Sequence, residues 1–181
     1  MLIVLAGLPG VGKTSIGRQL ANQLKATYLR IDTIEHAIRA QATPGVDVAD
    51  GGYVVAYRIA EDNLRLGQIV IADSVNPIEI TREAWLGVAR TAAVPILDVE
   101  IICSNQEMHR RRVETRQSDI AGLELPTWDA IQAREYHAWS RAHLIVDTAT
   151  KTIDECVAEV ISRLRERGLK PGTPAIPSGV A

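Results

Sequence analysis

Eight residues near the start of the chain have the types and the spacing of a phosphate-binding loop, G-x-x-x-x-G-K-[S/T]. In order, they are Gly7, Leu8, Pro9, Gly10, Val11, Gly12, Lys13 and Thr14. Glycines accept backbone angles that a Cβ would forbid, so consecutive N–H groups can turn toward one anion. We therefore expect this loop, together with Ser15 behind it, to bind the phosphates of a nucleotide.

The last two residues of the pattern predict both the nucleotide and its metal. A lysine at the place of Lys13 reaches the β- and γ-phosphates, and a hydroxyl at the place of Thr14 binds Mg²⁺. An apolar run, 2–6, precedes the loop, and residues 15–24 read as a helix whose positive end would face the same anion. The sequence therefore predicts ATP and Mg²⁺ as cofactors, although these residues leave GTP open as the nucleotide.

Two aspartates follow apolar segments that are typical of strands. Asp73 follows residues 69–72, where a carboxylate can bind Mg²⁺ directly or through water, and a helix N-cap is the alternative. Asp32 follows residues 27–31, where a carboxylate can accept a proton from an acceptor hydroxyl. Its alternative is to cap the helix expected at 33–39, a role that is compatible with proton transfer.

Arginines dominate the helix expected at 105–116. Arg112 and Arg116 are four residues apart and so share a face, from which they could neutralise charge on a transferred phosphoryl group. Adjacent helical residues point about 100° apart, so Arg110, Arg111 and Arg112 cannot all face one ligand. We predict catalytic roles for Arg112 and Arg116, together with Lys13 and Asp32.

Strand-like and helix-like segments alternate along the whole chain. Strands are expected at 2–6, 27–31, 69–72, 94–103 and 144–146, and helices at 13–24, 33–39, 53–66, 80–92, 105–116, 127–139 and 153–167. This order predicts a three-layer α/β fold with a parallel sheet. Ligands of such sheets bind at the carboxyl ends of the strands, where the glycine-rich loop and both aspartates would meet.

Composition narrows the class of protein. The chain has 181 residues, 46% of them hydrophobic, and a net charge of -2, so no overall basic field attracts nucleic acid. Cys103 and Cys156 match no metal or redox spacing, and the apolar run at the start is too short for a signal peptide or a membrane span. We expect a soluble cytoplasmic protein with one domain at 1–168, without a membrane partner, and a mobile tail at 169–181.

Several further motifs resemble the AAA_33-like small P-loop kinases of the chloramphenicol phosphotransferase, zeta-toxin and polynucleotide 5′-kinase type. The segment at 30–33 resembles the one that carries their catalytic aspartate. The pattern D-[ST]-x-N…R-x-x-W resembles the polynucleotide kinase branch, and later segments resemble the lid arginines and the post-lid region. The D-[ST]-x-N…R-x-x-W pattern lies at 73–76 and 82–85. The lid arginines correspond to 112–116, and the post-lid region corresponds to 126–128 and 134–139.

This resemblance implies a sheet order of 2-3-1-4-5 and a helical lid at about 110–138. It makes Asp32 the general base and Arg116 a lid arginine, and it places Asn76 and Arg82 in the substrate-binding region. Polynucleotide kinases have an arginine three residues after the aspartate, where this chain has Glu35. Because Glu35 would repel an acceptor phosphate, a neutral or cationic hydroxyl compound fits better than a nucleic-acid end.

The resulting hypothesis is an ATP-dependent phosphotransferase that acts on a hydroxyl group of a small molecule. A polynucleotide or RNA 5′-hydroxyl kinase is the alternative within the enzymes. A non-catalytic ATP-binding switch is the alternative outside them, whereas a GTPase switch would need an N-K-x-D or T-K-x-D motif that the chain lacks. The identity of the acceptor and the oligomeric state are left open.

Overall fold

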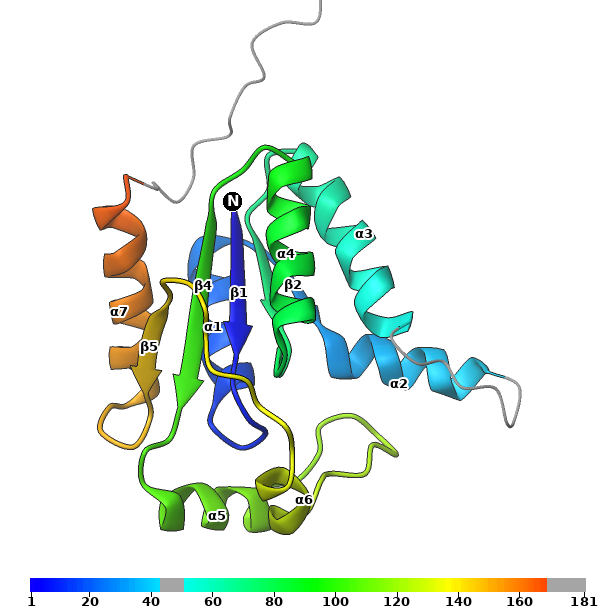
Figure 1. Ribbon diagram of the computed structural model, residues 1–181, viewed down its shortest axis with the longest axis vertical. Coiled ribbons are helices and arrows are strands. Elements are labelled where there is room, and N and C mark those ends of the chain that lie inside the picture. Colours follow the sequence, from blue (N-terminus) through cyan, green and yellow to red (C-terminus); the bar gives the residue numbers. More distant parts are fainter. Residues whose placement is uncertain (43–50, 169–181) are drawn as a thin grey trace, which may run out of the picture.

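The computed structural model describes residues 1–42 and 51–168. Its centre is a five-stranded parallel sheet in the order β2-β3-β1-β4-β5, which confirms the predicted fold and strand order. The strands are β1 (Leu2–Ala6), β2 (Thr27–Arg30), β3 (Val70–Asp73), β4 (Ile96–Ile102) and β5 (Leu144–Asp147). In Figure 1 the arrowheads of β1, β4 and β5 point to the same end of the molecule.

Helices cover both faces of the sheet because side chains alternate along each strand. Ile3 and Leu5 pack on one face with α1 (Lys13–Leu24) and α7 (Ile153–Glu166). Leu2 and Val4 pack on the other with α3 (Gly51–Arg65) and α4 (Glu79–Thr91). Every residue of β1 is buried, as expected for a central parallel strand.

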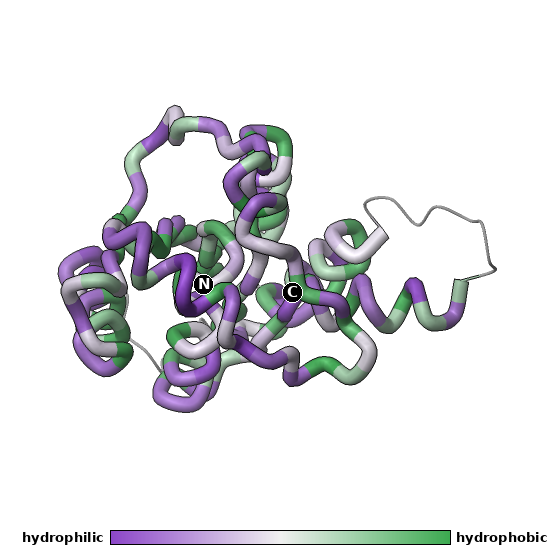
Figure 2. The backbone as a smooth tube through the Cα atoms, turned by 90° about the horizontal axis from the view of Figure 1, so that it is seen from below, coloured by the Kyte–Doolittle hydropathy of each residue, from purple (hydrophilic) through white to green (hydrophobic). Residues whose placement is uncertain are grey.

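Three further helices lie toward the carboxyl ends of the strands. α2 (Ile31–Gln41) follows β2 without a loop, and α5 (Gln106–Thr115) and α6 (Trp128–Gln132) cross below the sheet in Figure 1. Seen from that end in Figure 2, the helices alternate between hydrophilic and hydrophobic colours along their length. Such amphipathic helices bury one face and leave the other to solvent.

The predicted helix at 127–139 is the largest error of the sequence analysis. Thr127 caps α6, since its side chain accepts a hydrogen bond from the backbone N–H of Ala130, but the helix ends at Gln132. Residues 133–143 instead run across the molecule without helical structure, and the N–H of His137 donates to the carbonyl of Pro77 at 2.8 Å. A contact 60 residues away in sequence therefore overrides the local helical pattern.

Smaller differences concern element ends and segments outside the described residues. α2 begins at Ile31, so Asp32 lies in the first helical turn rather than at the end of the strand, and Arg30 occupies the N-cap position. Residues 43–50, which lie between the helices expected at 33–39 and 53–66, and the tail at 169–181 are outside the described residues. Within the described part of the chain, no helix has the length and apolar character needed to cross a membrane.

Candidate active site

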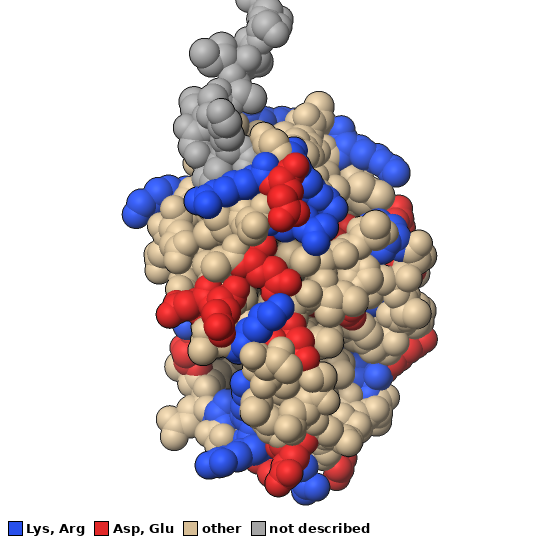
Figure 3. All heavy atoms as spheres, turned by 90° about the vertical axis from the view of Figure 1, so that its left-hand side faces the viewer, with Lys and Arg blue, Asp and Glu red and all other residues tan. Residues whose placement is uncertain are grey.

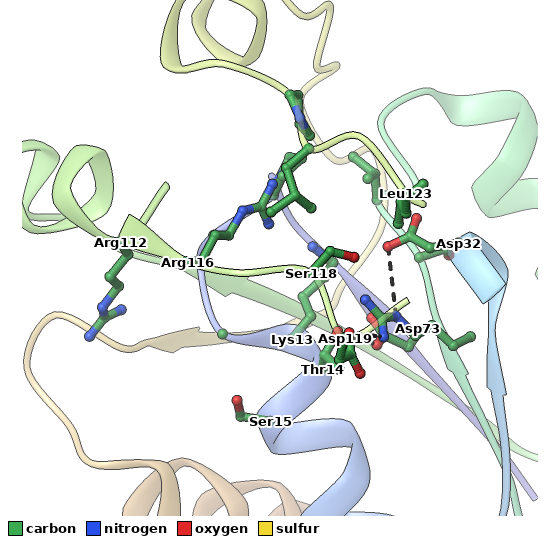
Figure 4. Close-up of a pocket in the computed structure, with 18 of the residues that line it drawn as sticks. Lys13, Thr14, Ser15, Asp32, Asp73, Arg112, Arg116, Ser118, Asp119 and Leu123 are labelled. Atoms are coloured by element: carbon green, nitrogen blue, oxygen red, sulfur yellow. Dashed lines mark hydrogen bonds and ion pairs between the residues drawn. The ribbon is translucent and has the colours of Figure 1, made fainter. Parts of the chain in front are cut away.

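A cavity of about 620 Å³ lies at the carboxyl ends of the strands, between the glycine-rich loop and the segment that follows α5. Figure 4 shows the side chains that enter it from the loop, from α2, from β3 and from residues 116–123. Ten of the predicted site residues line this cavity. They are Pro9, Gly10, Gly12, Lys13, Thr14, Ser15, Asp32, Asp73, Arg112 and Arg116.

The loop has the backbone shape that its glycines predict. Gly7 and Gly10 both have positive φ, at 134° and 88°. A Cβ on Gly7 would lie 2.1 Å from the carbonyl oxygen of Ile101, and one on Gly10 would lie 2.6 Å from the side chain of Val113. Neither position tolerates a side chain without movement of β4 or α5, so both glycines are needed for conformation and for space.

Lys13 lies at the centre of the loop and is 9% exposed. Its ammonium donates a hydrogen bond to the carbonyl of Leu8 at 2.9 Å. Burial lowers the pKa of Lys13, whereas the nearby carboxylates of Asp73 and Asp32 raise it. A buried cation with one backbone partner is well suited to bind a phosphate, which would supply the missing negative charge.

Asp73 ends β3 and is 3% exposed. One of its oxygens, Oδ2, accepts hydrogen bonds from the hydroxyl of Thr14 at 2.8 Å and from the phenol of Tyr28 at 2.5 Å. Burial, together with the charge of Asp73, raises the pKa of Tyr28, so the phenol stays protonated and donates. Sequence reasoning paired Thr14 with Asp73 but missed Tyr28, since nothing near it in sequence signals such a role.

The Thr14–Asp73 pair fits a divalent cation held together with nucleotide phosphates. In the described residues, no group of three or more His, Cys, Asp or Glu side chains forms a metal cage. Mg²⁺ in nucleotide sites uses one or two protein oxygens, with phosphate oxygens and waters as its other ligands. A buried carboxylate beside a hydroxyl, at the foot of a phosphate-binding loop, supplies that donor set.

Asp32 reaches the cavity from the first turn of α2. Its side chain is 53% exposed, and one carboxylate oxygen lies 3.8 Å from Nε of Arg30. The carboxylate is therefore open to a ligand while the arginine holds it on one side. Asp32 makes no side-chain cap to its helix, so the capping alternative considered above is not observed.

Arg112 and Arg116 do not act as a pair in this structure. Arg112 donates to the hydroxyl of Thr148 at 2.8 Å and to its carbonyl at 3.0 Å, and it points away from Lys13 in Figure 4. α5 ends at Thr115, and Arg116 has an extended backbone. The four-residue helical spacing therefore no longer aligns the two side chains.

Arg116 enters the cavity with unused hydrogen-bonding capacity. Its Nε and Nη2 atoms are buried and have no hydrogen-bond partner within the described part of the chain. Burial lowers the pKa of Arg116, and the neighbouring Arg30 lowers it further, while Asp32 raises it. A half-buried guanidinium without partners is costly unless an anion binds beside it.

Five charged residues that sequence reasoning did not assign to the site also line the cavity: Arg18, Arg30, Asp119, Glu124 and Arg134. Asp119 accepts a hydrogen bond from Arg30 at 2.7 Å and forms a second ion pair with Arg18 of α1. Both guanidinium groups lower the pKa of Asp119 to about 2. Arg134 follows α6 and lies close enough to Lys13 to lower the pKa of Lys13. These residues come from separate segments, so only the fold reveals that they meet.

Asn76 and Arg82, which the resemblance placed in the substrate-binding region, are fully buried and do not line the cavity. The amide of Asn76 donates to the carbonyl of Leu5 at 3.1 Å and accepts from the indole of Trp85 at 3.2 Å. This corrects their placement: Asn76 ties the turn after β3 to β1, directly below the phosphate-binding loop. Contact with a substrate would require both side chains to leave the core.

Arg82 anchors the segment that leads away from α6. Its Nε donates to the carbonyl of Asn76 at 2.9 Å, and its Nη2 donates to the carbonyl of His137 at 2.8 Å. Its guanidinium lies 4.2 Å from the ring centre of Trp139 and 5.2 Å from that of Tyr136. A buried arginine that satisfies carbonyls and stacks on aromatic rings is a structural clamp.

Glu35, also predicted to face the substrate, does not line the described cavity. Its carboxylate pairs with Arg39 one turn further along α2, at 3.0 Å. Its side chain packs against Gly52 of α3, where an added Cβ would lie 2.2 Å from Cγ of Glu35. The argument from repulsion by Glu35 therefore finds no support in its position.

The fold and the site define a P-loop protein of the nucleotide-binding α/β class. The AAA domain family model, AAA_33, matches residues 2–138, which run from β1 past α6. The chain belongs to this family. The more specific resemblance, to chloramphenicol phosphotransferase or zeta-toxin, receives no separate support from the comparisons.

Individual relatives cover nearly the full length of the chain. A shikimate kinase from Symbiobacterium thermophilum is 31% identical over 183 residues, which is 93% of this chain and 98% of that protein. The Mycobacterium tuberculosis APS kinase CysC, solved with AMPPNP and APS, is 20% identical with a TM-score of 0.69, covering 91% of this chain and 96% of its own. Chaetomium thermophilum Kti12, solved with ADP-AlF3, is 22% identical with a TM-score of 0.69, and the match covers 92% of this chain and 98% of the Kti12 chain.

Proposed function

We propose that this protein is a kinase that transfers the γ-phosphate of ATP, in the presence of Mg²⁺, to a hydroxyl group of a small molecule. The observation that carries the proposal is the set of groups that converge on one cavity: a buried lysine, a Thr–Asp pair, an exposed carboxylate and an arginine with two buried nitrogens that have no hydrogen-bond partner among the described residues. Phosphoryl transfer requires this division between charge stabilisation and proton acceptance. The shikimate kinase relative supports the same class of reaction.

The nucleotide would bind across the loop at 7–14. Backbone N–H groups and the N-terminus of α1 would hold the phosphates, and Lys13 would leave Leu8 to meet the β- and γ-phosphates. Thr14 and Asp73 would hold Mg²⁺, which neutralises phosphate charge when bound. Ser15 lies on the same cavity wall, one residue further along α1.

Asp32 would act on the acceptor. Its carboxylate accepts the proton of the acceptor hydroxyl as that oxygen attacks the γ-phosphorus, and the bond from phosphorus to the β–γ bridging oxygen breaks to release ADP. Arg116 would stabilise the charge that spreads over the γ-phosphate oxygens. Arg112, held by Thr148, would contribute from the wall of the nucleotide site rather than at the transferred group.

We further propose that residues at about 110–138 form a lid over the single kinase domain at 1–168. The segment at 117–126 lines the cavity and follows the arginine-bearing α5. Its closure would exclude water, which matters because water competes with the acceptor for the phosphoryl group. Asp119 supplies a contact that holds this segment to α1 and β2.

The charged side chains that line the described cavity are of both signs and do not form a purely basic surface. Arg18 and Arg30 are already paired with Asp119, while Asp32 and Glu124 add negative charge to the wall. In the face shown in Figure 3, acidic and basic side chains are interspersed rather than gathered into one basic surface. Both features favour a small molecule over a polynucleotide end.

The experiment is an acceptor screen with γ-labelled ATP, with Lys13→Ala as the inactive control. The panel contains sugars, nucleosides, aminoglycoside- and phenicol-type antibiotics, shikimate, adenylyl sulfate and 5′-hydroxyl oligonucleotides. Label transfer to a small hydroxyl compound would support the proposal. Transfer to oligonucleotides alone would replace it with a polynucleotide kinase, and ATP binding without any acceptor-stimulated turnover would favour a regulatory switch.

A further inference from the structure

Tyr28 lies beneath the nucleotide site, where no motif predicts a functional residue. It belongs to β2, pairs in register with Ile71 of β3, and points toward α1. A Cβ on Gly17 of α1 would lie 2.9 Å from the Tyr28 ring and equally close to Leu5. Only a glycine at that point of α1 leaves room for the ring, which carries its hydroxyl to Asp73.

The hydrogen bonds around Asp73 are divided unequally between its two oxygens. Oδ2 accepts from both Tyr28 and Thr14, and a carboxylate oxygen has about two lone-pair sites. No donor in the described residues reaches Oδ1. Two fixed donors on one oxygen therefore set the carboxylate plane and leave the other oxygen free for a metal ion or its water.

The same arrangement orients the hydroxyl of Thr14. A hydroxyl has one proton to donate and two lone pairs, and Thr14 gives its proton to Asp73. Its lone pairs then remain available for a cation. Because Tyr28 occupies the second site on Oδ2, it keeps Asp73 in the one orientation that uses Thr14 in this way.

We propose that Tyr28 is a positioning residue for the Mg²⁺ site, acting through Asp73. This inference rests on the proposed function, because it takes Thr14 and Asp73 as the protein groups that hold the cation. Hydrogen-bond partners of metal-binding side chains typically change metal affinity by about 10- to 100-fold when removed. A tyrosine that served only to fill space would not affect metal binding once its hydroxyl was removed.

The test is Tyr28→Phe, which keeps the ring against Gly17 and removes only the hydroxyl. We expect the affinity of the ADP-bound protein for Mn²⁺, measured by electron paramagnetic resonance, to fall by about tenfold or more. Affinity for ADP without metal should be unchanged. The matched control is Thr27→Val, which removes the neighbouring hydroxyl of β2, bound to Asn63 at 3.2 Å and away from the cavity.

Asp73→Asn separates failure of this inference from failure of the proposed function. If Asp73→Asn weakens Mn²⁺ binding but Tyr28→Phe does not, Tyr28 only fills space and the inference is overturned. In the Asp73→Asn background, Tyr28→Phe should have no additional effect on Mn²⁺ binding. If Asp73→Asn leaves Mn²⁺ binding unchanged, the assignment of the metal ligands is wrong, and the inference about Tyr28 falls with it.

Discussion

The two halves of the cavity are built in different ways. The nucleotide half comes from one continuous stretch, 7–15, joined to the buried end of β3. The other half, which we propose as a lid and call the lid half, comes from residues far apart in sequence, such as Arg116, Asp119 and Arg134, and depends on contacts with α1, β2 and α4. A continuous motif on rigid strands suits a ligand with a fixed shape, whereas a surface assembled from separate segments can vary with the acceptor.

The sharpest test of the nucleotide half is Lys13→Ala. We expect it to abolish phosphoryl transfer and to weaken ATP binding, because the variant removes the cation at the centre of the loop. Acceptor phosphorylation and ATP affinity are the measurements. Lys25→Ala, at the exposed end of the same helix, is the control and should behave like the wild type. Near-normal turnover in Lys13→Ala would overturn the assignment of the loop.

Arg116→Ala tests the lid half at the transferred phosphoryl group. We expect kcat to fall on the order of 10³-fold, as when an arginine finger is removed. The control is Arg111→Ala, an exposed arginine of α5. An effect on KM alone would mean that Arg116 binds the ground state, and the lid half would then contribute affinity rather than catalysis.

Asp32→Asn tests the residue at which the two halves meet. The amide has the size of the carboxylate but cannot accept a proton at neutral pH, so transfer should fall by about 10²- to 10⁴-fold. Thermal stability and ADP affinity should stay normal, with exposed Asp62→Asn as the control. Asp73→Asn should instead raise the Mg²⁺ concentration required for activity. A normal transfer rate in Asp32→Asn would remove the proposed general base.

Sequence reasoning succeeded where the physical signal is local. The glycine-rich loop and the apolar strands each depend on neighbours in sequence, and the structure contains both. The strand order came from the resemblance rather than from the residues themselves. Lys13 and Asp73 both line the cavity, and their roles there stay predictions that the experiments above test directly.

The errors arose where distant contacts decide the conformation. Residues 133–139 have a helical pattern, but Arg82 binds their carbonyls and stacks on their rings, so the helix ends early. The placement of Asn76 and Arg82 in the substrate-binding region came from the resemblance, and their burial in the core could be seen only in the fold. Tyr28 was overlooked because its partner, Asp73, lies 45 residues away.

Arg82→Met tests whether this clamp is structural. The variant keeps an apolar stem of similar length but leaves buried carbonyls without donors, so the free energy of unfolding should fall by about 3 kcal/mol. Urea denaturation measures it, and Arg90→Met on the exposed side of α4 is the control. If Arg82→Met has the stability of the wild type but a raised KM for the acceptor, Arg82 binds the substrate and is not a structural clamp.

Asp119→Asn should have the smallest effect of these variants. It tests whether ion pairs stabilise the position of the lid half. Asp119 joins the segment after α5 to Arg18 and Arg30 through partly exposed ion pairs. Such pairs are worth about 0.2–1 kcal/mol, so we expect amide hydrogen exchange at 117–126 to accelerate by about two- to fivefold. Glu114→Gln, which breaks an exposed pair with Arg110 inside α5, should leave that exchange unchanged.

The ion pairs of Asp119 with Arg18 and Arg30 should weaken as the pH falls. The two arginines lower the folded-state pKa of Asp119 from an ordinary value of 3.8 to about 2. A carboxylate with a lowered pKa contributes its full stabilisation above the ordinary value and loses it as the pH falls through the folded-state value. Wild-type exchange at 117–126, corrected for the intrinsic rate, should therefore approach that of Asp119→Asn between pH 4 and pH 2. If the exchange rates of the wild type and Asp119→Asn differ by the same factor at pH 7 and at pH 2, the charge of Asp119 does not stabilise the lid half.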